Sequence, residues 1–182
     1  MAQLFALDQQ LTERYSDLPA SMTYTRDKLH EFCNLKKDPW FVAMHTIYHQ
    51  SKIVLHSTMV PHFSGISLQH AVPRAAVRTS ARTALEGAKL MSEMAADLNS
   101  LSIDAARLPP FTGYCMYVSA SILIAFISSK DEALAATARS GLVSVLKVLE
   151  QMKLCWKHLD KLVSLEYTYE EHYSLKTCSG QE

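Results

Sequence analysis

The chain has 182 residues, 48% of them hydrophobic, and its 18 Lys and Arg residues are balanced by 18 Asp and Glu residues. This length suits one domain with a buried core. The zero net charge argues against a domain that grips nucleic acid phosphates through an excess of basic residues. Only 5 Gly and 6 Pro residues occur, which favours long helices joined by few loops over a sheet of many strands.

The first part of the chain predicts one helix followed by a loop. Apolar residues recur at helical spacing from Leu4 to Tyr15. Pro19 marks the end of this helix, because the residue before a proline avoids the helical conformation. Residues 21–37 show no clear pattern.

A second helix is expected to begin at Asp38, with Asp38 as its cap and Pro39 in the first turn. It runs towards Pro61. Between Pro39 and Pro73 the only Lys, Arg, Asp or Glu is Lys52. A helix with so little charge must be covered on most sides.

The remaining pattern is also helical. Further helices are expected at Arg74–Leu98, within Leu108–Ser129, from about Glu132 to Met152, and from Trp156 to about Tyr169. Residues 114–127 are almost wholly apolar. We therefore expect an all-α, multi-helix bundle with a central, nearly uncharged helix.

The expected domain organisation has three parts. Residues 1–37 form the N-terminal helix and loop, residues 38–172 form one helical domain, and residues 173–182 form a flexible tail.

Three histidines share one face of the helix that begins at Asp38. His45, His49 and His56 lie at spacings of four and seven. Two imidazoles four residues apart can bind a metal ion, so His45 and His49 are candidate ligands. No Glu follows the first His, as a zinc protease would require, and no third ligand is identifiable. Packed structural histidines are the favoured interpretation.

The four cysteines also give no metal motif. No two of them have the close spacing of a zinc finger or ribbon, and they stand at Cys33, Cys115, Cys155 and Cys178. No cofactor is expected in this chain.

A basic stripe is formed by Arg74, Arg78 and Arg82. It could contact phosphate or an acidic partner. Glu86 continues the same stripe, which is typical of an ordinary solvated helix face.

The uncharged run Leu108–Ser129 is long enough to span a bilayer, which takes about 20 residues. It opens with two prolines and contains Gly113, and its strictly apolar part has the length of a buried core helix. We expect a core helix and no membrane partner, with a membrane-associated helical protein as an alternative.

No pattern of enzyme chemistry stands out, because the chain has neither a nucleophile elbow nor a phosphate-binding glycine loop. We expect no enzyme. A second alternative is a bundle that binds a small ligand near Tyr48, His49, Tyr114 and Tyr117, whose polar tips stand on otherwise apolar helices.

Four segments together resemble a known family. Asp38-Pro39-Trp40-Phe41 followed by "AMHTIYHQSKIVLH" is similar to the "LHxxYHxxxIxLH" helix of the fungal-specific transcription factor domain, matching at His45, Tyr48, His49, Ile53, Leu55 and His56. "LPPFTGYCMYVSASILI" is similar to its "PFxGYxxYxAAxxxL" helix, matching at Phe111, Gly113, Tyr114, Tyr117 and Ala120. "RTALEGAKLMSEM" and "ARSGLVSVLKVLEQMKLCWKHLDKLVSLE" resemble the helices that follow these two motifs, and the order agrees over about Pro39 to Leu165.

The resemblance covers only the C-terminal portion of that regulatory domain. The family often has Arg-Pro directly after the last His, whereas Ser57-Thr58-Met59 follows His56 here. The six-cysteine zinc cluster that binds DNA in the family has no counterpart, so zinc and DNA contact are expected only through a segment absent from this sequence. The resemblance implies a nuclear regulator of transcription that acts through protein partners, intramolecular contacts or a small-molecule inducer. Without the upstream helices, the chain is expected to expose an apolar patch and to self-associate.

Overall fold

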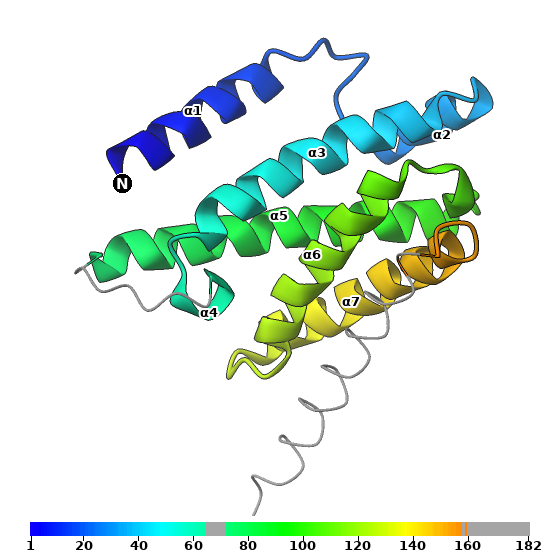
Figure 1. Cartoon of the computed structure of the whole chain (residues 1–182). Helices are drawn as coiled ribbons and strands as arrows, with labels where there is room; N and C mark the ends of the chain where they lie inside the picture. Colours follow the sequence, from blue (N-terminus) through cyan, green and yellow to red (C-terminus); the bar gives the residue numbers. More distant parts are fainter. Residues whose placement is uncertain (65–71, 158, 160–182) are drawn as a thin grey trace, which may run out of the picture.

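The computed structural model describes residues 1–64, 72–157 and 159, and these residues form helices without strands, as Figure 1 shows. The helices are α1 (Ala2–Ser16), α2 (Arg26–Asn34), α3 (Asp38–Ser57), α4 (Pro61–Ser64), α5 (Arg74–Ser100), the 3₁₀ turn η1 (Ala105–Arg107), α6 (Pro110–Ile127) and α7 (Glu132–Lys153). The all-α, multi-helix bundle expected from the sequence is confirmed.

The core of the bundle is built from α3, α5, α6 and α7 (Figure 1). The central helix is α6, which packs on all three of the others and carries no charged residue. Its buried side chains include Cys115, Met116, Ala120 and Leu123, all fully enclosed. The hydroxyl of Ser119 is also buried and donates to the backbone oxygen of Ala88 on α5 at 3.1 Å. A helix surrounded in this way needs apolar residues on most faces, which explains its uniform composition.

The thiol of Cys115 lies at the centre of this core. Its side chain is fully buried, and burial raises its pKa to about 12. By contrast, Cys33 is partly exposed and Cys155 is exposed.

The helix α2 lies in the stretch for which the sequence gives no pattern. Thr25 caps it by accepting a hydrogen bond from the N–H of Lys28 at 3.1 Å. Its Phe32 ring stacks on Phe41 of α3, with 4.4 Å between the ring centroids. A nine-residue helix shows too few periodic positions to be recognised from sequence, and this one is fixed by its packing on α3.

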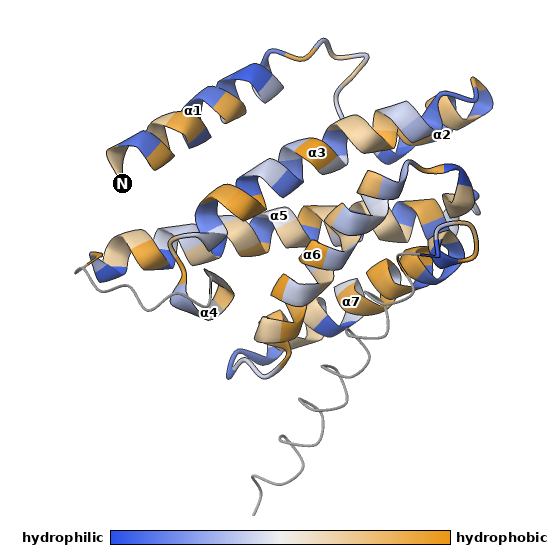
Figure 2. Ribbon diagram, in the orientation of Figure 1, coloured by the Kyte–Doolittle hydropathy of each residue, from blue (hydrophilic) through white to orange (hydrophobic). Residues whose placement is uncertain are grey.

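The first helix, α1, lies at the edge of the molecule. It runs along α3 (Figure 1), and none of its residues is fully buried. Figure 2 shows hydrophilic and hydrophobic positions alternating along it. Leu7 is 54% exposed although it belongs to the predicted apolar stripe.

Some sequence predictions fall outside the described residues. These are the last predicted helix beyond Leu159, the domain end at 172, the tail at 173–182, and Cys178. Among the described helices, α6 alone has the length and composition to cross a membrane, and 56% of it is buried inside the bundle. A core helix of a water-soluble bundle meets the same criterion.

Candidate functional site

The histidine face of α3 is covered by α1. His45 is fully buried, and one of its ring nitrogens lies 2.5 Å from the hydroxyl of Tyr15 on α1. The rings of Tyr24 and Phe41 also contact the imidazole, at centroid distances of 5.2 and 4.6 Å. Burial lowers the pKa of His45 to about 4, although the backbone of Met22 acts in the opposite direction. His45 is therefore neutral at physiological pH.

His49 lies one turn further along α3. Its side chain packs against the rings of Tyr15 and Tyr48, at 5.9 and 5.0 Å, while these two tyrosines stack on each other at 3.6 Å. Burial, with smaller effects from His45 and Lys52, lowers the pKa of His49 to about 4. His49 is only 7% exposed.

His56 and Lys52 bind the carboxylate of Asp8 on α1. The Oδ1 atom of Asp8 lies 2.7 Å from Nζ of Lys52 and 3.1 Å from Nε2 of His56. Lys52 also donates to the hydroxyl of Thr12 at 2.9 Å, and the other ring nitrogen of His56 lies 3.1 Å from the hydroxyl of Ser80. Burial acts to raise the pKa of Asp8, but the bonds to Lys52 and His56 outweigh it and lower that pKa below 3.8.

These contacts give the histidines a structural role. Within the described ranges, no three His, Cys, Asp or Glu side chains gather where they could hold a metal ion. The two candidate metal ligands, His45 and His49, instead face aromatic rings of α1 and α3. The arrangement binds α1 to α3 through ring contacts and polar bonds.

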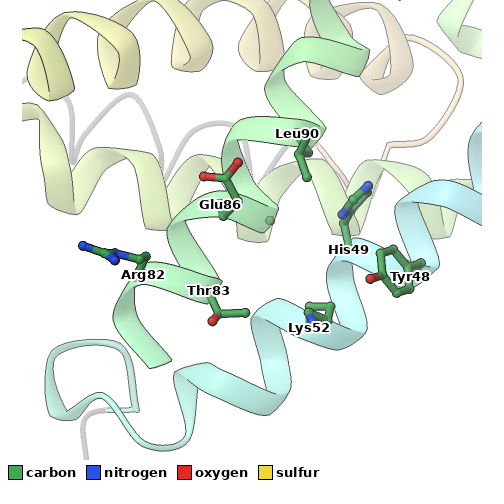
Figure 3. Close-up of a pocket in the computed structure, with 8 residues that line it drawn as sticks. Tyr48, His49, Lys52, Arg82, Thr83, Glu86 and Leu90 are labelled. Carbon is green, nitrogen blue, oxygen red and sulfur yellow. The ribbon is translucent and has the colours of Figure 1, made fainter. Parts of the chain in front are cut away.

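A groove separates α3 from α5 beside this contact (Figure 3). Its volume is about 420 Å³, within the range of small-molecule sites. Tyr48, His49 and Lys52 line it from α3, and Figure 3 shows Thr83, Glu86 and Leu90 opposite them on α5. The guanidinium of Arg82 points away from this space in the same view.

The other two tyrosines of the predicted ligand pocket lie elsewhere. Tyr114 lines a second groove of about 420 Å³ between α3 and the start of α6. Tyr117 is partly buried against the hydrophobic core. The four predicted residues thus do not share one pocket, because Tyr48 and His49 face α5 whereas Tyr114 lies beside the opposite side of α3.

The basic stripe on α5 is exposed, as its sequence suggested. Arg74, Arg78 and Arg82 all lie at the surface, and Glu86 is exposed one turn beyond them.

The residues that bind α1 to α3 were missed by sequence reasoning. Asp8, Thr12 and Tyr15 follow one another at spacings of four and three, so they share a face of α1. Lys52, the partner of Asp8 and Thr12, is the one charged residue of α3 after Asp38. A lone cation in an uncharged stretch was therefore the available signal for a polar contact at this position.

The fold and these contacts define an all-helical bundle with a peripheral N-terminal helix and two grooves along α3. A scan against protein-family models finds no match, and searches of curated proteins and of solved structures return no similar chain.

Proposed function

We propose that this chain is the non-DNA-binding, regulatory helical part of a transcription factor, acting in the nucleus through contacts with other proteins. The observation that carries this proposal is the ordered set of four family-like segments. They occupy α3, α5, α6 and α7, the four helices that pack together as one core. The four segments therefore belong to one packed unit, as a single regulatory domain requires.

The surface of the chain is compatible with protein contacts. Its net charge is zero, and large apolar side chains are exposed on α3 and α6, including Trp40, Ile47, Val54 and Phe111. Exposed apolar residues of this kind mark sites of protein association. This part of the proposal involves no catalysis and no cofactor.

The regulatory role can be tested by fusing the full chain to an unrelated DNA-binding domain in a fungal reporter strain. We expect the fusion to change reporter transcription several-fold relative to the DNA-binding domain alone. A fusion carrying Ile47→Glu, which places a charge on the exposed apolar face, is expected to lose the effect. The proposal is refuted if reporter transcription with the fusion equals that with the DNA-binding domain alone, when both proteins are equally abundant.

The chain alone is expected not to bind duplex DNA. The exposed Arg74, Arg78 and Arg82 are followed by the acidic Glu86 and belong to a neutral chain, so few phosphate contacts are available. A gel-shift titration at low salt tests this. A retarded complex that weakens steeply with added salt would contradict it.

A small-ligand-binding bundle is a second candidate function, and His49 favours it. The imidazole of His49, which its lowered pKa keeps neutral, lines the groove between α3 and α5. Such a group can donate and accept one hydrogen bond each to an uncharged ligand.

Thermal-shift screening with uncharged aromatic alcohols such as 4-methylphenol tests this candidate. His49→Phe should abolish any stabilisation by the compound, whereas Tyr114→Phe, in the other groove, should leave it intact. Stabilisation that both variants retain in full would discard this groove as a ligand site.

A further inference from the structure

The helix α1 contacts α3 through one narrow face (Figure 1). Its partly buried residues recur every three or four positions along the helix, and they are Leu4, Phe5, Asp8, Leu11, Thr12 and Tyr15. All other residues of α1 are exposed, and none is fully buried. An amphipathic helix bound in the groove of another protein makes its contacts in the same way. In its contacts, α1 therefore resembles a bound helical peptide.

The closest contacts between α1 and α3 are polar or aromatic. The Oδ1 atom of Asp8 lies 2.7 Å from Nζ of Lys52 and 3.1 Å from Nε2 of His56. The ring of Tyr15 stacks on Tyr48, with 3.6 Å between the ring centroids. Water can hydrate the charged groups and the hydroxyls once the helices separate, which it cannot do for the apolar side chains of the core. Undocking α1 therefore costs less free energy than opening the bundle.

A short linker joins α1 to the part of the chain that is fixed to the bundle. In residues 17–21, only Leu18 is partly buried, and the others are exposed. The chain is held again at Tyr24, whose hydroxyl donates to Asp97 on α5 at 3.1 Å and whose ring stacks on Phe41 of α3 at 5.8 Å. The linker can thus change its conformation and release α1 while the contacts of Tyr24 remain.

The face of α3 beneath α1 favours a particular kind of helix. Among the residues that the structure describes, Lys52 is ion-paired with Asp8 alone, so release of α1 leaves its ammonium group without a carboxylate. Tyr48 then loses the ring that stacks on it. On α1, Asp8 and Tyr15 are two turns apart, which is about 10 Å along a helix. A helix with a carboxylate and, two turns later, a tyrosine therefore fits this face.

We propose that the face of α3 formed by Tyr48, Lys52 and His56 binds an acidic amphipathic helix of a partner protein, and that α1 occupies this face until the partner displaces it. Both helices use the same atoms of α3, so they exclude each other. Docked α1 lowers the apparent affinity for the partner in proportion to the fraction of molecules in which the face is free.

This inference rests on the proposed function, because it identifies the kind of protein contact through which the regulatory chain acts. Its test uses the purified full chain and measures binding of a helix. The helix exchange can therefore fail in solution while the reporter fusion still changes transcription, and the two failures are distinguishable.

A fluorescently labelled peptide of residues 1–18 is the probe, and its anisotropy measures the Kd for the full chain. Asp8→Lys in the full chain should tighten peptide binding by about 10-fold, because α1 then loses its bonds to Lys52 and leaves the face free. Glu13→Lys is the matched control, since it makes the same change of charge on the exposed side of α1. It should leave the Kd unchanged. Circular dichroism and urea unfolding check that both variants keep the folded core.

The same two substitutions in the peptide test the chemistry of recognition. With the Asp8→Lys chain, the Asp8→Lys peptide should bind about 10-fold more weakly than the wild-type peptide. The Glu13→Lys peptide has the same net charge and should bind as the wild-type peptide does. A chain with Lys52→Glu should reverse the order and prefer the Asp8→Lys peptide, because the ion pair is then restored with its charges exchanged.

Three results would overturn the proposal. One is equal affinity of the Asp8→Lys and Glu13→Lys chains for the wild-type peptide. Another is equal binding of the Asp8→Lys and Glu13→Lys peptides. The third is a wild-type chain that sediments as a dimer and becomes a monomer with Asp8→Lys, which would assign the face to α1 of a second copy.

Discussion

At the residue scale, the neutral imidazoles of His45 and His49 tie the stability of the molecule to pH. Both pKa values fall from 6.5 to about 4 in the folded chain, mainly through burial. Between pH 6.5 and pH 4 the unfolded chain binds protons that the folded chain does not. The free energy of unfolding therefore decreases as the pH falls. One pKa unit corresponds to about 1.4 kcal/mol, so the combined effect is on the order of several kcal/mol.

We therefore expect the free energy of unfolding to decrease steadily as the pH is lowered from 6.5 to 4. Below pH 4 a further decrease follows, because the pKa of Asp8 lies below 3.8 and its protonation removes the bonds to Lys52 and His56. Urea unfolding at pH 7 and pH 4.5 measures the first effect. His49→Phe should reduce the difference between the two conditions, and equal wild-type stability at both pH values would contradict the assignment.

Lys52 is the residue on which the docking of α1 depends most directly. Its side chain is 15% exposed, and its ammonium group contacts both Asp8 and Thr12. Lys52→Met should weaken the docking by about 1–3 kcal/mol, because the Asp8 carboxylate loses an ionic partner in a partly buried position. Hydrogen exchange of the α1 amides should then become roughly 10-fold faster.

The control for this substitution is Lys28→Met. Lys28 pairs with Glu31 at 2.6 Å on the exposed side of α2, where an ion pair contributes little. Exchange rates in α1 that respond equally to both substitutions would show that the Lys52 contacts do not hold the helix.

At the element scale, the close approach of α5 and α7 depends on Gly141. A Cβ atom added to Gly141 would lie 2.7 Å from Oγ and 3.0 Å from Cβ of Ser92, and 3.3 Å from Leu123. Alanine stabilises an exposed helix position by about 1 kcal/mol relative to glycine. At this contact we expect alanine to destabilise the fold, because the two helices would have to move apart.

Chemical denaturation of Gly141→Ala measures the free energy of unfolding, which we expect to fall by about 1–3 kcal/mol. Ser140→Ala, at the adjacent exposed position, should change stability by less than about 0.5 kcal/mol. A Gly141→Ala chain that is more stable than the wild type would show that α5 and α7 are less closely packed than described.

The long helices could be predicted from the sequence, and the reasons are physical. The helix α5 is amphipathic over many turns, and Pro39 and Pro110 stand in the first turns of α3 and α6. In contrast, α2 depends on the stacking of Phe32 on Phe41, a contact that a local pattern does not contain.

The candidate site was less accessible to such reasoning. The shared face of His45, His49 and His56 was visible in their spacing, but its partner was not. The contact with α1 joins residues 30 to 48 positions apart, as in the bonds from Tyr15 to His45 and from Asp8 to His56. The separation of Tyr114 from Tyr48 likewise follows from how α6 packs beside α3.

At the scale of the whole molecule, α1 is an accessory to a core that it does not help to fill. None of its residues is fully buried, and its contacts lie chiefly with α3. Deleting residues 2–16 should leave a cooperatively folded bundle with the helical signal of the remaining helices. Calorimetry and circular dichroism test this, and a chain that no longer unfolds cooperatively would contradict it.

The buried thiol of Cys115 provides a chemical record of how often the centre of the bundle opens. The thiolate of a cysteine attacks an alkylating reagent, and in the folded chain burial and the raised pKa of Cys115 suppress that reaction. Cys155 is exposed and Cys33 is partly exposed, so both should react faster than Cys115. Slow alkylation of Cys115 would then proceed only as fast as α6 separates from its neighbours. Its time course would report the lifetime of the native core without any perturbing label.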